Sequence, residues 1–344
     1  MQKPQALQVL SPSFPRKASR AAINDSRTDE RKEFKMTEDF TIQSLHDQVP
    51  IHLTKFQPEE EPVRARVLIL HGMCEHQGRY REFAQFLADQ GLEVYTMDWR
   101  GHGETLVDGH LGYFASESGY LVQTGDLIHV IETIDRGDLP FLVFAHSMGT
   151  LYARFLLQSR PHFCDLLLLS GPPANNSKVG GAILMARLLS AIRPEAPSSF
   201  LQKITFADYA KSVRNRKTDL DWLSCDPENV AAYMADPLCG FPFTNRGFLD
   251  LYLLTKACFE RPSSEEKLSY DLPIHLFRGK GDPCPRPNDG GPEEIKETLQ
   301  AWGFSRISEK VYAHSRHELL FDQDKDQVYQ DLLATINNHL SGTR

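Results

Sequence analysis

A serine in the stretch FLVFAHSMGT, residues 141–150, stands where it could act as a nucleophile. The apolar run 141–145 predicts a buried strand and the run from Thr150 onward predicts a helix, so Ser147 lies on the turn between them. A serine at such a turn is exposed at the carboxyl edge of a sheet, beside free backbone amides. Because a plain hydroxyl is a poor nucleophile, this interpretation requires a base and an orienting acid elsewhere in the chain.

Two residues far along the chain could supply that acid and base. Asp282 comes just after the stretch PIHLFRGKG and His317 just after ISEKVYAHSR, and both stretches predict strands. Parallel strands bring their carboxyl ends to one edge of a sheet, where both side chains would meet Ser147. Asp282 would orient the imidazole of His317, which would remove the serine proton, so the three residues predict a catalytic triad.

Neighbouring residues leave alternatives open. Asp282 precedes a proline and could be an ordinary turn residue. His314 could serve as the base in place of His317, although it lies inside the predicted last strand. Asp322 and Asp324 follow the histidine, and we expect them to be solvated residues at the start of the last helix.

A serine hydrolase also needs donors for the oxyanion of its tetrahedral intermediate. The amide of Met148, directly after the serine, is one candidate. The amide of Met73 in ILHGMCEHQGRY is the other, because the His71-Gly72 pair before it lets the backbone approach a substrate closely.

These residues require a framework of alternating strands and helices. The segments 40–45 and 49–56 alternate in polarity and predict a hairpin. Strand-then-helix units follow at 65–72 and 79–91, 92–99 and 121–135, and 141–147 and 150–158, with further strands at 164–172, 273–282 and 307–317 and a closing helix at 326–340. This alternation predicts an α/β fold with a mostly parallel central sheet flanked by helices.

The strand rhythm is interrupted once. Residues 173–262 are mostly helical in pattern, which predicts an inserted helical cap over a core formed by residues 37–172 and 263–344. In GGAILMARLLSAI the apolar residues cover more than one helix face, so part of that helix could contact an acyl chain or a lipid surface. Residues 1–36 lack periodicity, and we expect a disordered N-terminal arm there.

Composition excludes several classes of function. The net charge of −8 argues against nucleic-acid binding and against strongly anionic interfaces, because both need a basic excess on one face. No apolar run approaches the roughly 18 residues of a membrane span, and no signal peptide is evident. The six cysteines have no paired spacing. We therefore expect a cytoplasmic protein with reduced thiols. The sequence contains no phosphate loop, no dinucleotide fingerprint and no close metal-ligand spacing of histidines, so it implies no cofactor and no metal.

The motifs HGMCEHQGRY, MDWRGHGET, AHSMG, DPLCGFPF, RGKGD and SRHE together resemble the serine hydrolases of the monoacylglycerol lipase and lysophospholipase branch of the α/β-hydrolase fold. The resemblance extends from about residue 63 to the C-terminus. It implies the triad named above, an oxyanion hole of the Met73 and Met148 amides, and a cap over an acyl-chain channel. It also favours hydrolysis of a lipid monoester, either a monoacylglycerol or a lysophospholipid, through an acyl-enzyme. The apolar cap helix could contact a membrane or micelle transiently, so a protein that is cytoplasmic or peripheral at the membrane is expected.

The chain departs from the pattern of this family at several positions. Ala145 replaces a glycine, Met73 and Cys74 replace smaller residues, and Glu104 stands where a small residue is common. We expect His76 and Arg79 to brace the loop through hydrogen bonds rather than to contact substrate. Cys74 lies near the expected oxyanion loop and could be accessible to thiol reagents, but we expect it to be a bystander rather than a second nucleophile.

Two other functions remain compatible with the same residues. An acyltransferase would use the same triad and pass the acyl group to an acceptor other than water. A non-catalytic binding protein could keep the fold, although it would not need the serine, aspartate and histidine in this order. The sequence leaves the oligomeric state open.

Overall fold

The computed structural model describes residues 37–59, 62–134, 137–260 and 269–342. The predicted N-terminal arm, residues 1–36, lies outside the described residues, as does the predicted end of the insertion at residue 262. All six cysteines are free. None of the helices in the described ranges is both long enough and apolar enough to span a membrane.

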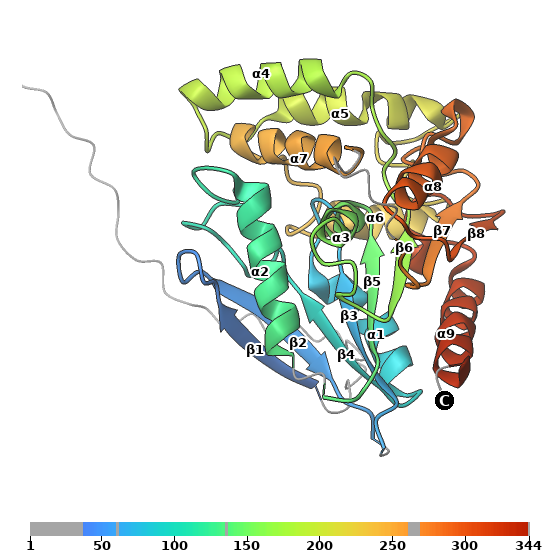
Figure 1. Ribbon diagram of the computed structural model, residues 1–344. Helices are drawn as coiled ribbons and strands as arrows, with labels where there is room; N and C mark the ends of the chain where they lie inside the picture. Colours follow the sequence, from blue (N-terminus) through green and yellow to red (C-terminus); the bar gives the residue numbers. More distant parts are fainter. Residues whose placement is uncertain (1–36, 60–61, 135–136, 261–268, 343–344) are drawn as a thin grey trace, which may run out of the picture. The chain divides into compact units, whose positions relative to one another are not determined.

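The described strands form one eight-stranded sheet in the order β1-β2-β4-β3-β5-β6-β7-β8 (Figure 1). The strands are β1 (Thr37–Gln43), β2 (Pro50–Phe56), β3 (Ala65–Leu70), β4 (Leu92–Met97), β5 (Phe141–His146), β6 (Leu166–Ser170), β7 (Ile274–Gly279) and β8 (Ile307–Tyr312). β1 and β2 form the predicted antiparallel hairpin, and β2 also pairs antiparallel with β4. Every pairing from β4 to β8 is parallel, which confirms the predicted mostly parallel sheet.

Successive residues of the central strands face two apolar clusters, one on each face of the sheet. In β5, Val143 and Ala145 belong to one cluster, whereas Leu142 and Phe144 belong to the other. The first cluster includes side chains of α2 (Gly119–Thr133), α3 (Met148–Leu157) and α8 (Gly291–Ala301), and the second includes side chains of α1 (Arg81–Ala88) and α9 (Lys325–Gly342). Because both faces are covered, these strands are apolar throughout rather than alternating.

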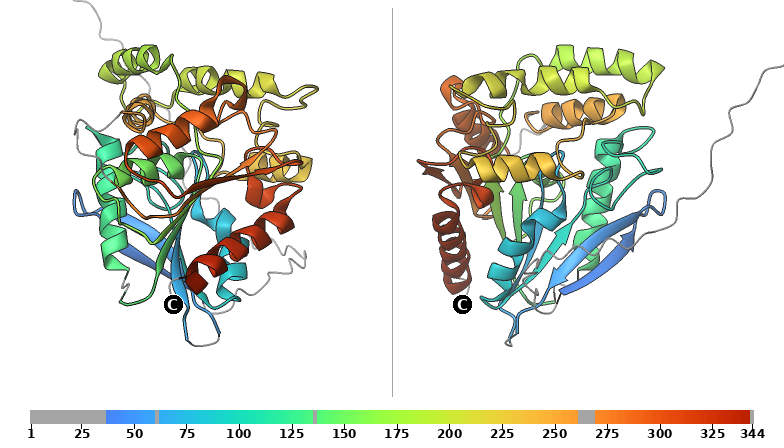
Figure 2. Two further views of the ribbon diagram at one scale, coloured as in Figure 1. Left: turned by 45° about the vertical axis from the view of Figure 1, so that its right-hand side comes forward. Right: turned by 180° about the vertical axis from the view of Figure 1, so that it is seen from behind.

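Among the described residues, four helices lie between β6 and β7 in the chain, and we call them the inserted helices. They are α4 (Val179–Ile192), α5 (Ser199–Ser212), α6 (Pro227–Ala235) and α7 (Asn245–Ala257). Figure 2 shows α4, α5 and α7 stacked above the carboxyl ends of the parallel strands. Side chains of α4, α5 and α7 join the apolar cluster that also contains α2 and α3, so these helices are packed onto the core.

One predicted boundary was wrong. β8 ends at Tyr312, and His314 lies in the turn that follows, where its amide donates to the Asp324 carboxylate at 2.8 Å. His314 is therefore outside the strand, although it is close to His317 in the sequence.

Candidate active site

Ser147 occupies the sharp turn between β5 and α3. Its backbone has φ +50° and ψ −116°, a conformation that L-residues rarely adopt and that marks a strained position. The turn is anchored by the Ser147 amide, which donates to the carbonyl of Ser170 at 2.9 Å. A side chain at Gly149 would lie 2.6 Å from the Leu70 carbonyl oxygen, so only glycine lets α3 start this close to the end of β3.

The structure brings the three predicted triad residues together. His317 Nε2 lies 2.8 Å from Ser147 Oγ, and His317 Nδ1 lies 3.0 Å from Asp282 Oδ2. Nδ1 faces a carboxylate and therefore carries the ring proton, which leaves Nε2 free to accept the hydroxyl proton of Ser147. Asp282 and His317 are both buried, and Asp282 also accepts the amide of Cys284 at 2.9 Å.

The environment of His317 favours its charged form. Burial by itself would lower the pKa of His317, but the Asp282 carboxylate and the hydrogen bond to it outweigh burial and raise the pKa above its ordinary value. Burial lowers the pKa of the neighbouring His146, and the charge of His317, whose ring centroid lies 4.7 Å away, lowers it further. The pKa of His317 is thus raised whereas that of the adjacent His146 is lowered, so His317 binds a proton more readily.

The loop after β3 lies beside the nucleophile. A side chain at Gly72 would lie 3.0 Å from Ser147 Cβ, so the backbone passes next to the serine. The amide of Gly72 donates to Glu75 Oε1 at 2.6 Å, which fixes the loop from within. In the described part of the chain, the amides of Met73 and Met148 donate no hydrogen bond.

Two histidines of this loop serve as braces. His71 Nδ1 donates to the Gly72 carbonyl at 2.8 Å, and its Nε2 accepts the Trp99 amide at 3.2 Å. Burial lowers the pKa of His71 well below its ordinary value, so this ring is neutral. His76 Nε2 lies 2.9 Å from Asp236 Oδ2, which follows α6 and belongs to the insertion.

Arg79 is the centre of a buried charge cluster behind the loop. Its Nη1 lies 2.7 Å from Glu75 Oε2 and 2.6 Å from Glu318 Oε1, and its Nη2 lies 2.9 Å from Glu318 Oε2. Its guanidinium also stacks over the rings of Tyr233 and Phe321. Both expected braces, His76 and Arg79, therefore contact protein groups through hydrogen bonds.

Comparison with known proteins places the chain in a family. The sequence model of the family described as "Serine aminopeptidase, S33", an α/β-hydrolase family, matches residues 61–324. The chain belongs to this family. The hydrolase is 32% identical to a monoacylglycerol lipase of Mycolicibacterium smegmatis over 285 residues, which cover 82% of this chain and 91% of the relative. It is 29% identical to the human monoglyceride lipase over 170 residues, which cover 48% of this chain and 52% of that enzyme.

Solved structures agree with the fold. A carboxyl esterase from Bacillus coagulans, solved in complex with glycerol, superposes with a TM-score of 0.76 at 25% identity, over 88% of this chain and 99% of the esterase. The monoglyceride lipase of Saccharomyces cerevisiae superposes with a TM-score of 0.67 at 19% identity, over 88% and 94% of the two chains. The α/β-hydrolase fold predicted from the sequence is confirmed.

Sequence reasoning missed several residues that hold the site. Asp322 was expected to be solvated, but it is 4% exposed. Its carboxylate accepts the amides of Arg316 at 2.7 Å and of Cys225 at 2.9 Å, and so ties the loop of His317 to the insertion. The sequence left open whether Cys74 is accessible to thiol reagents, and the structure buries it to 3% exposure, where Tyr233 and Gly240 of the insertion bond to its carbonyl.

The insertion also encloses a small cavity at the serine. The cavity has a volume of about 40 Å³. It is lined on the core side by Gly72, Met73, Ser147 and His317 and on the insertion side by Gln202, Phe206, Leu220, Trp222, Leu223, Tyr233 and Gly240. The centroid of the Trp222 ring lies 5.0 Å from that of His317, so the insertion directly covers the His317 imidazole.

Proposed function

We propose that this hydrolase cleaves a lipid monoester, a monoacylglycerol or a lysophospholipid, through an acyl-enzyme on Ser147. The hydrogen-bonded series from Asp282 through His317 to Ser147 is the observation that carries the proposal. The Mycolicibacterium smegmatis relative, a monoacylglycerol lipase matched over 91% of its length, supports the substrate class. The enzyme is accordingly a carboxylic ester hydrolase.

The chemistry follows from the positions of the proton and the oxyanion. His317 Nε2 takes the proton of Ser147 Oγ as that oxygen attacks the ester carbonyl, and then gives it to the leaving alcohol. The amides of Met73 and Met148, which have no other acceptor among the described residues, stabilise the oxyanion. Water then repeats the sequence on the acyl-enzyme and releases the fatty acid.

The insertion, residues 173–262, acts in this proposal as a cap that controls entry. A cavity of about 40 Å³ has room for a water molecule or two, whereas sites for small organic ligands are typically hundreds of Å³. A long acyl chain therefore reaches Ser147 only after side chains of the cap, such as Phe206, move away.

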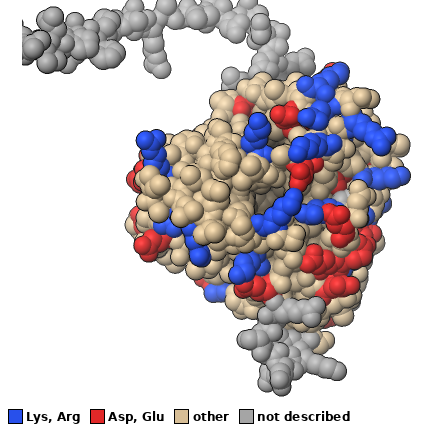
Figure 3. All heavy atoms as spheres, turned by 90° about the horizontal axis from the view of Figure 1, so that it is seen from above, with Lys and Arg blue, Asp and Glu red and all other residues tan. Residues whose placement is uncertain are grey.

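The outer face of the cap is suited to a membrane or micelle surface. Leu184, Leu188 and Ile192 follow one another at helical spacing on α4 and are 61%, 58% and 79% exposed. Phe200 and Ile204 of α5 are also exposed. Figure 3, seen from above, shows a broad uncharged area with Lys and Arg side chains, and some Asp and Glu side chains, along its border.

The charge of this segment differs from that of the whole chain. Residues 178–217 hold eight Lys or Arg against two Asp or Glu, although the chain carries a net charge of −8. The net charge therefore conceals a basic region beside the exposed apolar side chains, and that combination favours binding to a lipid surface. Replacing Leu188 and Ile192 with serine should weaken binding to phosphatidylcholine–phosphatidylglycerol vesicles, whereas Leu121→Ser, an exposed leucine on α2, should not. Equal vesicle binding by the wild type and the Leu188/Ile192 variant would refute the proposed contact with a lipid surface.

The catalytic proposal is tested by product analysis. Purified protein should release free fatty acid from monoacylglycerols or lysophosphatidylcholines, with Ser147→Ala as the blank, and a fluorophosphonate should label Ser147. Transfer of the acyl group to an added alcohol in place of fatty acid release would indicate an acyltransferase. Failure of the folded protein to form a Ser147 adduct would refute every function based on this serine.

A further inference from the structure

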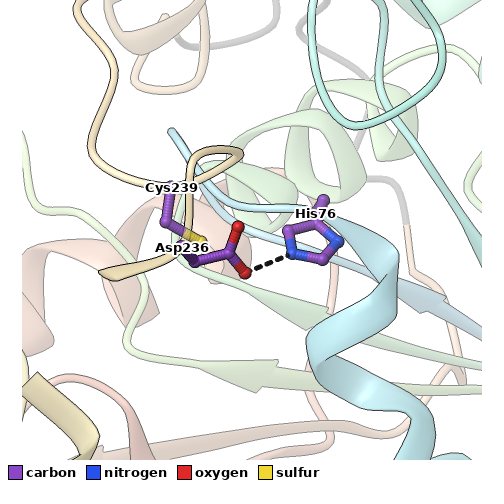
Figure 4. Close-up of side chains that lie close together, drawn as sticks. All are labelled: His76, Asp236 and Cys239. Atoms are coloured by element: carbon purple, nitrogen blue, oxygen red, sulfur yellow. Dashed lines mark hydrogen bonds and ion pairs between the residues drawn. The ribbon is translucent and has the colours of Figure 1, made fainter. Parts of the chain in front are cut away.

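Three side chains capable of binding a metal meet at the edge of the cap. In the described part of the chain, His76, Asp236 and Cys239 form the one group of three such residues whose ligand atoms all lie within 4.8 Å of one another. His76 precedes the short helix η1 (Gln77–Tyr80), and the other two residues belong to the turn after α6 (Figure 4). None of the three is part of the triad.

The turn aims two of these ligands in one direction. Asp236 Oδ1 accepts the Leu238 amide at 2.8 Å, and the Cys239 amide donates to the Asp236 carbonyl at 3.0 Å. These bonds close the turn so that the side chains of residues 236 and 239 lie on the same side of it. Asp236 Oδ2 remains directed at His76 Nε2, which is 2.9 Å away.

The spacing suits a tetrahedral ion. Zinc bonds of about 2.0 to 2.3 Å place neighbouring ligand atoms about 3.5 Å apart. The distance of 2.9 Å between His76 Nε2 and Asp236 Oδ2 is slightly shorter than this ligand-to-ligand distance. The three ligand atoms lie within 4.8 Å of one another, which is somewhat longer than it. Side-chain adjustments of about 1 Å would complete three bonds and leave the fourth position for water.

We propose that His76, Asp236 and Cys239 form a binding site for Zn²⁺ that joins the loop after β3 to the cap. Thiolate and imidazole ligands select zinc over magnesium and calcium, which prefer oxygen. One thiolate and one carboxylate also balance the double charge of the ion. The side chains of His76 and Asp236 are 17% and 30% exposed, which gives an ion access from solvent.

Binding has a defined proton balance. Burial raises the pKa of Cys239, so without metal the sulfur carries a proton, which it releases when the S–Zn bond forms. As His76 Nε2 bonds to the ion, the ring proton moves from Nε2, which faces Asp236, to Nδ1. The 3.2 Å contact from the Gly78 amide to Nδ1 then lengthens. One proton is released for each ion bound.

The bound ion would reinforce an existing junction beside the catalytic cavity. The Tyr233 hydroxyl and the Gly240 amide already donate to the Cys74 carbonyl, at 2.7 and 2.9 Å. Cys74, Tyr233 and Gly240 all line the cavity that contains Ser147. Zinc therefore fixes the cap turn against the loop that carries the proposed oxyanion donor.

Cobalt titration of the full chain tests the site directly, since Co²⁺ replaces Zn²⁺ and a thiolate ligand gives a charge-transfer band in the near ultraviolet. We expect one Co²⁺ per chain, with the band abolished by Zn²⁺ and absent in Cys239→Ser. His76→Gln and Asp236→Asn should each weaken binding by more than about tenfold. Cys225→Ser, which removes a half-buried thiol elsewhere, should leave the titration unchanged.

A measurement on the unmodified protein makes the test independent of variant folding. Zn²⁺ added in weak buffer should release one proton per ion, and release of none would overturn the proposal. So would a thiolate band that persists in Cys239→Ser. The site does not depend on the proposed hydrolysis, because Ser147→Ala should bind Co²⁺ as the wild type does.

Discussion

Replacing Arg79 with methionine would remove the cation that two buried carboxylates share. Arg79 is 10% exposed and its guanidinium forms close contacts with Glu75 and with both oxygens of Glu318, which are 3% and 2% exposed. Methionine keeps most of the apolar stem but leaves both carboxylates without a counter-charge. Loss of one partner of a buried ion pair costs about 3 to 5 kcal/mol, and we expect a decrease of that size in the free energy of unfolding at pH 8.

The decrease in the free energy of unfolding should depend on pH, and the pKa values of Glu75 and Glu318 determine the sign of that dependence. Burial raises the pKa of Glu75, whereas at Glu318 the effect of burial is outweighed by Arg79, which lowers the pKa. Without Arg79 both pKa values rise, so at intermediate pH the folded variant binds more protons than its unfolded chain does. Its stability then falls as pH rises, and the deficit relative to wild type should be smaller at pH 5 than at pH 8.

Urea denaturation at both pH values measures this effect, and Arg81→Met is the matched control. Arg81 pairs with Asp39 at 3.4 Å, but the two side chains are 35% and 69% exposed, so its loss should cost less than about 1 kcal/mol. A deficit for Arg79→Met no larger than that of the control, or one that grows toward pH 5, would refute the proposed role of the cluster.

Three further predictions concern single groups. Asp282→Asn should lower kcat by about 10⁴-fold. It should also move the acidic limb of the pH profile of kcat/KM to lower pH, because the carboxylate that raises the pKa of His317 is lost. An acidic limb at the same pH as in the wild type would contradict this. Burial raises the pKa of Asp250 to about 7, so the folded state holds an extra proton between about pH 4 and 7 and loses stability as pH rises through that window. Asp250→Asn should therefore be more stable than wild type at pH 8, by up to about 4 kcal/mol, and equal denaturation midpoints at pH 8 would count against it. Tyr233→Phe removes the hydroxyl that donates to the Cys74 carbonyl and should cost about 1 kcal/mol in urea denaturation; an unchanged midpoint would show that the cap turn does not need this bond.

The sheet and the approach of the triad residues could be predicted because both depend on local patterns. Uninterrupted apolar runs marked the parallel strands, and the residues after β5, β7 and β8 meet wherever parallel strands end. Ser147, Asp282 and His317 lie after these three strands. The positions of these residues after the predicted strands were therefore enough to predict that the three side chains meet.

The residues that hold the site in place could not be found in this way. Arg79 and Glu318 are 239 positions apart, and neither lies in a periodic pattern that predicts burial. Asp322 precedes a helix, where acidic residues are usually solvated, and only the folded insertion places the Cys225 amide against it. His76 and Asp236 likewise meet across 160 positions. Such contacts depend on how the insertion lies on the core, which spacing in the sequence does not specify.

The contacts of the insertion also indicate which part of it can open. Its second half is bound to the core close to His317, since the Leu223 carbonyl accepts the Glu318 amide at 2.8 Å and the Cys225 amide donates to Asp322. The helices of its first half join the apolar core and also contact other parts of the insertion, since α4 packs on α7 and Thr205 of α5 bonds to Tyr252 of α7. Displacing the second half would disturb His317, whereas displacing α5 would remove Phe206 from the cavity. Entry of an acyl chain is therefore expected beneath α5, on the side where α4 and α5 expose their apolar face.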